Sequence, residues 1–206
     1  MSSISYDAEP RWRTERRDRI VDATVDLLRE GDLEQVQMNE VAAAAAVGKA
    51  TLYRYFPSKQ ALILACFDSF MSELCARVEQ AEAQDAEPRA RLVSLIGVAT
   101  DVLTRHKSFL RMLTRRKAEI DEDARRLMMS RRERLLAVVK HNIEDGIARG
   151  DYRDADSDLL PSLILGMLRG ATLTDAPTPP DRIGRTVTDL ILNGLTSGCA
   201  PRPNVE

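Results

Sequence analysis

The chain has 206 residues, of which 30% are charged and only 4% are aromatic, and its formal net charge is −2. This length suits one long or two short domains with a substantial buried core. The composition is typical of a helical protein in water. The longest apolar run, Val41 to Val47, is far too short to span a membrane, and the N-terminus has no apolar core of signal-peptide length. We therefore exclude a membrane partner and expect a cytoplasmic protein.

The N-terminal segment is basic. Residues 1–12 are polar and aperiodic and predict a flexible basic arm, and the stretch from Arg11 to Arg19 holds five arginines against two acids. A helix is predicted from about Arg13 to Glu30 and would end at Gly31 as its C′ residue. Its buried side would consist of Ile20, Val21, Thr24, Val25, Leu27 and Leu28.

The segment 38–57 has the spacing of a helix-turn-helix. Two short helices, 38–45 and 49–56, would face one another through Val41, Ala45, Val47, Leu52 and Tyr55, and Ala42 is small where the backbones approach. The second helix presents Lys49, Thr51 and Arg54, with Tyr53 and Tyr55 alongside, and no acid occurs between Val41 and Ser58. A helix of this composition suits the major groove of DNA, because the groove is flanked by phosphates.

The remaining chain predicts further helices and no strand. Pro57 breaks the chain and Ser58 can cap a long helix over 59–80, which would connect the two parts of the protein. Apolar stripes then predict helices over 88–105, 108–114, 123–149, 157–170 and 181–195, with a charged linker over 115–123. The fold is thus predicted to be all-α, with a DNA-binding head over 13–58, a helical bundle over 59–197 and a loose tail over 198–206.

The same residues resemble the DNA-binding unit of the TetR (tetracycline-repressor-like) family of bacterial transcription regulators. The resemblance covers about fifty contiguous residues and is carried by Arg16-Arg17, Ile20 to Leu28, Gly31, Val41-Ala42, Lys49, Thr51 to Lys59 and Ala61-Leu62. Three positions depart from the family pattern: Ala46 stands where such turns usually carry Gly, Gly48 replaces a Ser cap, and Gln37 replaces a Thr or Ser. If Ala46 has a positive φ, its methyl group costs about 1 kcal/mol.

The resemblance implies a transcriptional regulator, a repressor rather than an activator, that binds double-stranded palindromic operator DNA as a homodimer. It implies Lys49, Thr51 and Tyr53 near bases or the sugar-phosphate edge, and Tyr55 and Lys59 on phosphate. The complete set of predicted DNA-binding residues is Arg16, Arg17, Gln37, Gly48, Lys49, Ala50, Thr51, Tyr53, Arg54, Tyr55 and Lys59.

The C-terminal bundle would hold an unidentified small-molecule effector and form the dimer. Adaptable apolar side chains predict a pocket at Phe67, Phe70, Met71, Phe109, Met112 and Met128, although core packing explains most of them equally. The last two helices carry Gly166, Gly170, Gly184 and Gly194, which permit close crossings. They predict a dimer interface at Leu160, Ile164, Met167, Leu168, Val187, Leu190 and Ile191, residues that would otherwise serve as internal core.

Catalysis finds little support in the sequence. The only histidines, His106 and His141, have no carboxylate or cysteine at metal-ligand spacing, and the three cysteines form no Cys-x-x-Cys pair. No phosphate-binding loop or nucleophile elbow occurs. We therefore predict no enzyme, no cofactor and no metal. Two alternatives stay open: an all-helical small-molecule-binding protein or enzyme with an incidental helix-turn-helix-like hairpin, and an anionic effector bound by the basic stretch from Arg105 to Arg134.

Overall fold

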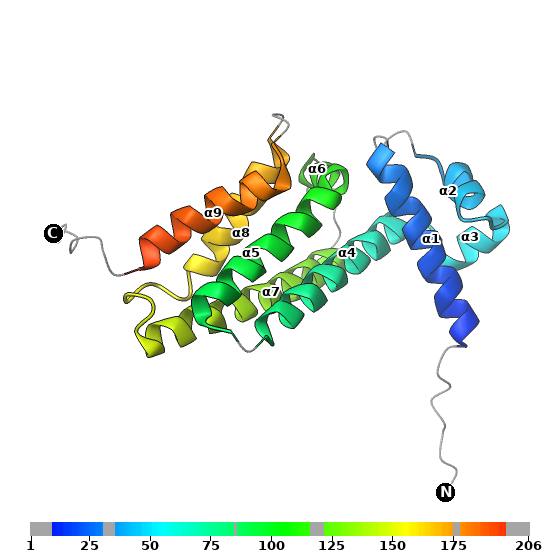
Figure 1. Cartoon of the computed structure of the whole chain (residues 1–206). Coiled ribbons are helices and arrows are strands. Elements are labelled where there is room, and N and C mark those ends of the chain that lie inside the picture. Colours follow the sequence, from blue (N-terminus) through cyan, green and yellow to red (C-terminus); the bar gives the residue numbers. More distant parts are fainter. Residues whose placement is uncertain (1–9, 31–35, 85, 116–121, 175–177, 197–206) are drawn as a thin grey trace, which may run out of the picture. The chain divides into compact units, whose positions relative to one another are not determined.

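The computed structural model describes residues 10–30, 36–84, 86–115, 122–174 and 178–196. Within these ranges the chain is entirely helical, which confirms the predicted all-α fold (Figure 1). The helices are α1 Arg11–Glu30, α2 Met38–Ala44, α3 Lys49–Tyr55, α4 Lys59–Glu82, α5 Pro88–Arg105, α6 Lys107–Arg115, α7 Glu122–Arg149, α8 Leu160–Leu173 and α9 Pro180–Leu195.

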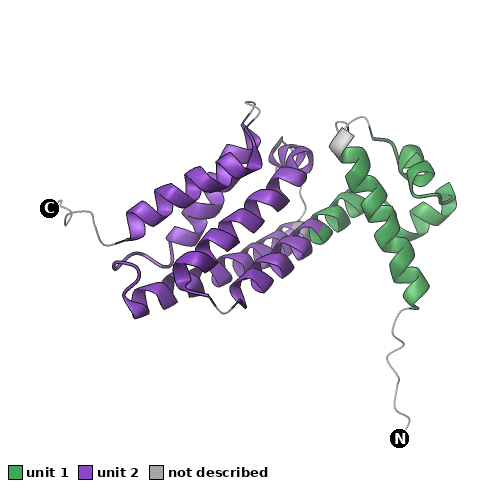
Figure 2. Cartoon of the chain, in the orientation of Figure 1, with its two compact units in different colours: residues 1–69 green, residues 70–206 purple. Residues whose placement is uncertain are grey.

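The chain divides into two compact units, Met1–Ser69 and Phe70–Glu206 (Figure 2). The division falls inside α4, whereas the sequence suggested a boundary before this helix. The reason is that the first turns of α4 belong to the core of unit 1. Cys66 is fully buried there, and its Sγ lies 4.0 Å from the carbonyl oxygen of Val21 in α1. Burial raises the pKa of this thiol to about 12.

Unit 1 is built around one apolar face of α1. The Thr24 hydroxyl on this face donates to the Ile20 carbonyl at 2.7 Å, so its polar group is satisfied inside the core. Helix α1 begins at Arg11, so Trp12 lies in its first turn and not in an arm. The predicted end at Gly31 lies outside the described residues. The apolar residues buried in the core of this unit include Ile20, Val21, Val25, Leu28, Val36, Val41, Ala45, Leu52, Phe56 and Leu62.

Unit 2 is organised around α5, which packs against α7, α8 and α9. Helix α9 runs beside α5 in the opposite direction (Figure 1). The two helices come close at Gly184, where an added Cβ would lie 3.5 Å from the Thr100 hydroxyl. The buried apolar side of α5 consists of Leu92, Leu95, Ile96, Ala99, Val102 and Leu103. All of these residues except Val102 form the apolar stripe that predicts a helix over 88–105.

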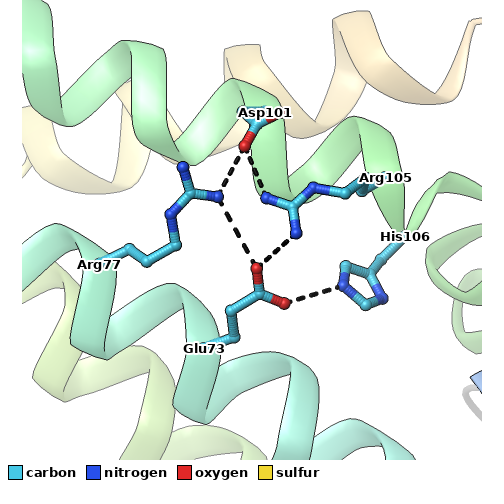
Figure 3. A network of polar contacts seen from close by, with 5 residues as sticks. All are labelled: Glu73, Arg77, Asp101, Arg105 and His106. Carbon is cyan, nitrogen blue, oxygen red and sulfur yellow. Dashed lines mark hydrogen bonds and ion pairs between the residues drawn. The ribbon is translucent and has the colours of Figure 1, made fainter. Parts of the chain in front are cut away.

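A network of ion pairs joins α4 to α5 within unit 2 (Figure 3). Asp101 accepts from Arg77 and Arg105 at 2.6 Å each, and Arg105 also donates to Glu73 at 2.7 Å. The buried ring of His106 lies 3.2 Å from the second Glu73 oxygen. Burial alone would raise the pKa of Glu73, but hydrogen bonds from Arg105 and His106 outweigh it and lower that pKa. The network therefore favours the ionised carboxylate.

Helix α7 ends in a Schellman motif. Gly150 has φ +81°, its amide donates to the Ile147 carbonyl, and the Asp151 amide donates to the Gly146 carbonyl. The ring of Tyr152 then folds back over Gly146, where a Cβ would overlap it. This position therefore requires glycine.

The start of α8 differs from the prediction. The sequence placed it at Ser157, but the helix begins at Leu160 and has Pro161 in its first turn. The Oδ1 atom of Asp156 accepts from the amides of Asp158 and Leu159 and so closes a turn that precedes the helix. Proline suits the first helical turn because its missing amide would have had no partner there.

Candidate nucleic-acid interface

The turn between α2 and α3 is a second Schellman motif. The Val47 amide donates to the Ala42 carbonyl at 2.9 Å, and the Ala46 amide donates to the Ala43 carbonyl at 3.1 Å. Ala46 takes the C′ position with φ 51°, as its departure from the family pattern suggested. It is the one non-glycine residue with positive φ among those described. The turn therefore keeps its geometry but carries the strain of an L-residue in the left-handed region.

Helix α3 starts without a side-chain cap. Gly48 is extended, with φ −70° and ψ 149°, and supplies only its carbonyl, which accepts from the Leu52 amide at 3.0 Å. The helix ends at Phe56, whose amide donates to the Leu52 carbonyl. The next helix is better capped, because the Ser58 hydroxyl accepts from the Ala61 amide at 3.1 Å, as predicted.

Helix α3 has a buried face and an exposed face. Leu52 is fully buried and Phe56 is 3% exposed, so both belong to the core. Tyr53 is 41% exposed, and Lys49 and Arg54 also lie on the exposed side. Among the described residues neither cation forms an ion pair, and the Arg54 guanidinium lies 5.9 Å from the Tyr55 ring centroid. An exposed helix with unpaired cations and no acid favours an anionic partner.

The other predicted contact residues are distributed around this helix. Gln37, Gly48 and Ala50 are exposed, whereas Thr51 and Tyr55 are half-buried. No hydroxyl side chain caps the start of α2. Instead, the backbone amide of Gln37 donates to the Glu40 carboxylate at 2.8 Å. The predicted contact residues on α3 and its flanks thus lie on adjacent turns. Their contacts with DNA stay a prediction.

Three predicted basic contacts are engaged within unit 1. Arg16 lies 5.5 Å from the centroid of the Trp12 ring, which is 55% exposed. Arg17 lies 5.5 Å from the centroid of the Phe56 ring. The Lys59 ammonium donates to the Val36 carbonyl at 2.7 Å. The sequence contains no signal for the last contact, because it joins residues 23 positions apart.

None of the predicted effector residues lines the apolar cavity between α4, α5, α7 and α8 of unit 2. Phe70 packs on Phe109 with ring centroids 6.3 Å apart, and both are buried, as are Phe67, Met71 and Met112. Met128 is half-buried. The cavity has a volume of about 20 Å³, and none of its lining residues was predicted to contact an effector. It is lined by α4, α5, α7 and α8 through Val78, Leu92, Leu95, Ile96, Ala99, Leu135, Leu136, Val139, Pro161, Ile164, Leu165 and Leu168.

The predicted interface residues fall into two groups. Ile164, Leu168, Val187 and Ile191 are buried within unit 2 itself, so their apolar surface is already covered. Leu160 and Met167 are half-buried, and Leu190 is 61% exposed. Leu163 on α8 and Leu159, the N-cap residue before it, are also exposed, although the residues predicted individually for the interface did not include them. An apolar surface that could contact a second copy of the chain would therefore be formed by the exposed leucines.

Neither a metal centre nor a membrane span emerges from the described part of the chain. In these ranges no three His, Cys, Asp or Glu side chains gather in a way that could hold an ion. Likewise, none of the helices described is long and apolar enough to cross a bilayer.

Fold and site together define an all-α protein with an N-terminal helix-turn-helix and a separate helical bundle. Residues 20–66 match the family model "Bacterial regulatory proteins, tetR family", and residues 85–195 match "Tetracyclin repressor-like, C-terminal domain". The second match covers more than half of the 206 residues. The chain belongs to the TetR family of bacterial regulatory proteins.

Individual relatives agree with this assignment. The chain is 37% identical over 101 residues to the HTH-type transcriptional repressor KstR of Mycobacterium tuberculosis; the match covers 49% of this chain and 46% of KstR. The chain spans about half the length of the KstR proteins that it matches.

Solved structures resemble the fold over most of the chain. A putative transcriptional regulator from Saccharomonospora viridis in complex with choline has a TM-score of 0.80 at 20% identity, covering 90% of this chain and 100% of that one. The regulator FadR from Bacillus subtilis in complex with stearoyl-CoA has a TM-score of 0.71 at 21% identity, covering 86% and 98%. At these identities the likeness concerns the fold alone.

Proposed function

We propose that the chain is a ligand-responsive transcriptional repressor that binds a palindromic operator as a homodimer. The observation that carries this proposal is α3, a short helix after a Schellman turn, with Lys49, Tyr53 and Arg54 exposed and no acid between Val41 and Ser58. Such a helix fits the major groove, where cations meet phosphate and side chains reach base edges. Operator DNA as the partner implies a cytoplasmic protein, and the proposal assigns no catalytic role.

Within this proposal the residues of α3 divide the work of binding. Lys49 and Arg54 contact phosphate and set affinity, because each releases condensed counterions from DNA. Thr51 and Tyr53 lie on the side of the helix nearest the bases and set sequence preference. Tyr55 is half-buried and contacts phosphate from the end of the helix.

The proposed dimer forms through the exposed side of α8 and α9. Leu159, the N-cap residue of α8, is 52% exposed, Leu163 on α8 is 48% exposed, and Leu190 on α9 is 61% exposed. Gly166 and Gly170 are exposed on α8, and nothing lies within 4 Å of where their Cβ atoms would be. Apolar side chains beside open glycines support close packing of a second copy. Two heads are needed because one half-site offers few contacts.

The proposed effector binds between α4, α5, α7 and α8. Every side chain that lines the cavity there is apolar, which supports a ligand with a substantial apolar part. The cavity of about 20 Å³ holds little more than one water molecule, so such a ligand must open it. A ligand releases DNA only if it binds the non-operator conformation better. Since α4 has residues in both units, we propose that it transmits the change.

A gel-shift experiment with total genomic fragments tests the proposal. At about 0.1 M salt the full chain should retain a small set of fragments against excess random-sequence competitor. A Lys49→Ala/Arg54→Ala variant, with both changes on the exposed side of α3, should fold normally and lose this retention. If the wild-type chain retains no fragment even at low salt, the alternative of an all-helical binding protein or enzyme becomes the better description.

A further inference from the structure

Two basic residues of unit 1 make contacts inside the unit that tie its short helices together. The Lys59 ammonium, at the start of α4, donates to the carbonyl of Val36 at 2.7 Å. Val36 is 7% exposed and directly precedes Gln37, the N-cap residue of α2. This hydrogen bond therefore joins the first turn of α4 to the segment that leads into α2.

Arg17 makes a comparable contact at the other end of the motif. Its guanidinium carbon lies 5.5 Å from the centroid of the Phe56 ring. Phe56 is 3% exposed and is the C-cap residue of α3. A guanidinium over an aromatic face is attracted by the ring quadrupole, and more strongly when it is partly shielded from water. Arg17 is half-buried, so it links α1 to the end of α3.

We propose that Lys59 and Arg17 are positioning residues, which fix α2 and α3 from inside the head, whereas Lys49 and Arg54 are the cations that dock on DNA. This inference rests on the proposed function and deepens it. It also reassigns the family-based expectation for Lys59, whose ammonium is directed to a backbone carbonyl and whose side chain is half-buried.

The short lengths of α2 and α3 explain why such contacts matter. Each helix has only 7 residues, and isolated helices of this length are not stable in water. Neither helix has a hydroxyl side chain as its cap. The orientation of α3 therefore depends on tertiary contacts at the two ends of the motif. Loss of either contact should disturb the geometry that distinguishes an operator from other DNA, while the cations on the docking face, which contact phosphate, stay in place.

The test compares Lys59→Met and Arg17→Met with Lys49→Met as the matched docking variant, all in the full chain. Methionine keeps an unbranched apolar stem and removes the cation. Binding is measured across a salt series on a duplex selected by the wild-type chain and on a scrambled duplex of equal length. The Lys49 variant should lower the salt slope by about one on both duplexes. The Lys59 and Arg17 variants should bind the selected duplex about tenfold more weakly, with nearly unchanged slope and scrambled-duplex affinity.

Amide exchange without DNA gives a second readout. Exchange over 37–56 should be at least tenfold faster in the Lys59 and Arg17 variants than in the wild type, and unchanged in the Lys49 variant. Lys59→Arg and Arg17→Lys, which keep charge and donors, should restore part of the discrimination between duplexes. If either methionine variant fails to fold, the corresponding conservative variant, Lys59→Arg or Arg17→Lys, is measured in its place.

A loss of about one unit of salt slope for Lys59→Met on both duplexes, with unchanged exchange, would mean that Lys59 is a phosphate contact and would overturn its positioning role. The same result for Arg17→Met would overturn the role of Arg17. If the wild-type chain itself does not separate the two duplexes, the proposed function fails. The exchange measurement without DNA still decides whether these residues position α2 and α3.

Discussion

Replacing Ala46 with glycine should stabilise unit 1, although it removes a methyl group and adds no contact. Ala46 occupies the C′ position of a Schellman turn with φ 51° and is exposed to solvent. Its counterpart at the end of α7 is Gly150 at φ +81°. The same motif thus occurs twice in the chain, once with the residue that the backbone conformation favours and once without it.

The expected magnitude is the difference between two terms. An L-residue in the left-handed region costs about 1–2 kcal/mol. Glycine in its place lowers the free energy of unfolding by about 0.4–1 kcal/mol, because the unfolded chain gains conformational freedom. We expect a net stabilisation of about 0.5–1 kcal/mol, which corresponds to roughly twofold to fivefold slower amide exchange by opening of the helix-turn-helix. Operator affinity should be retained, because the turn keeps its geometry.

Hydrogen exchange of peptides that cover 38–56, together with urea unfolding, would measure this change. Ala43→Gly is the matched control, since Ala43 lies exposed within α2 and the same substitution there should destabilise by about 0.5–1 kcal/mol. The two substitutions must therefore have opposite signs. Equal destabilisation by both would refute the reasoning, because it would mean that Ala46 is not strained.

Three further predictions concern unit 2. Burial raises the pKa of the Glu82 carboxyl above its unfolded value of 4.5. The stability that this shift contributes is therefore complete below pH 4.5 and is lost as the pH rises through the folded pKa. Glu82→Gln should raise the free energy of unfolding at pH 8 but not at pH 4 in urea unfolding, and destabilisation at pH 8 would contradict this. Gly146→Ala should destabilise by about 1–3 kcal/mol because the methyl group overlaps an aromatic ring, whereas Gly97→Ala, which meets nothing within 4 Å, should be neutral or stabilising by thermal unfolding. Leu163→Arg with Leu190→Arg, both exposed, should give a folded monomer that no longer protects an inverted repeat, and sedimentation of a dimer would refute the proposed interface.

Local signals explain why much of the fold was predictable from sequence. Apolar spacing identified the buried side of α5, and the Ser58 hydroxyl accepts the amide that its sequence position implied. The departure of Ala46 from the family pattern also pointed to the strained turn. Each of these features depends on residues within a few positions of one another, where helix geometry sets the constraints.

Long-range features were not predictable in the same way. Aromatic and methionine content suggested a pocket around Phe70, but the cavity is lined by aliphatic residues of four helices, a set fixed only by their packing. An apolar stripe likewise does not show whether Ile191 meets its own chain or another, and the residue is buried within unit 2. The bond from Lys59 to Val36 joins α4 to the segment before α2, and no periodicity reports such a contact.

Selection from a random-sequence duplex library tests most directly whether two copies of α3 read DNA together. The full chain would be incubated with the library at about 0.15 M salt, and bound duplexes would be recovered and sequenced over several rounds. The account predicts enrichment of an inverted repeat whose half-sites lie about one helical turn, roughly 34 Å, apart. Absence of any enriched sequence, or enrichment of a single unrepeated half-site, would contradict it.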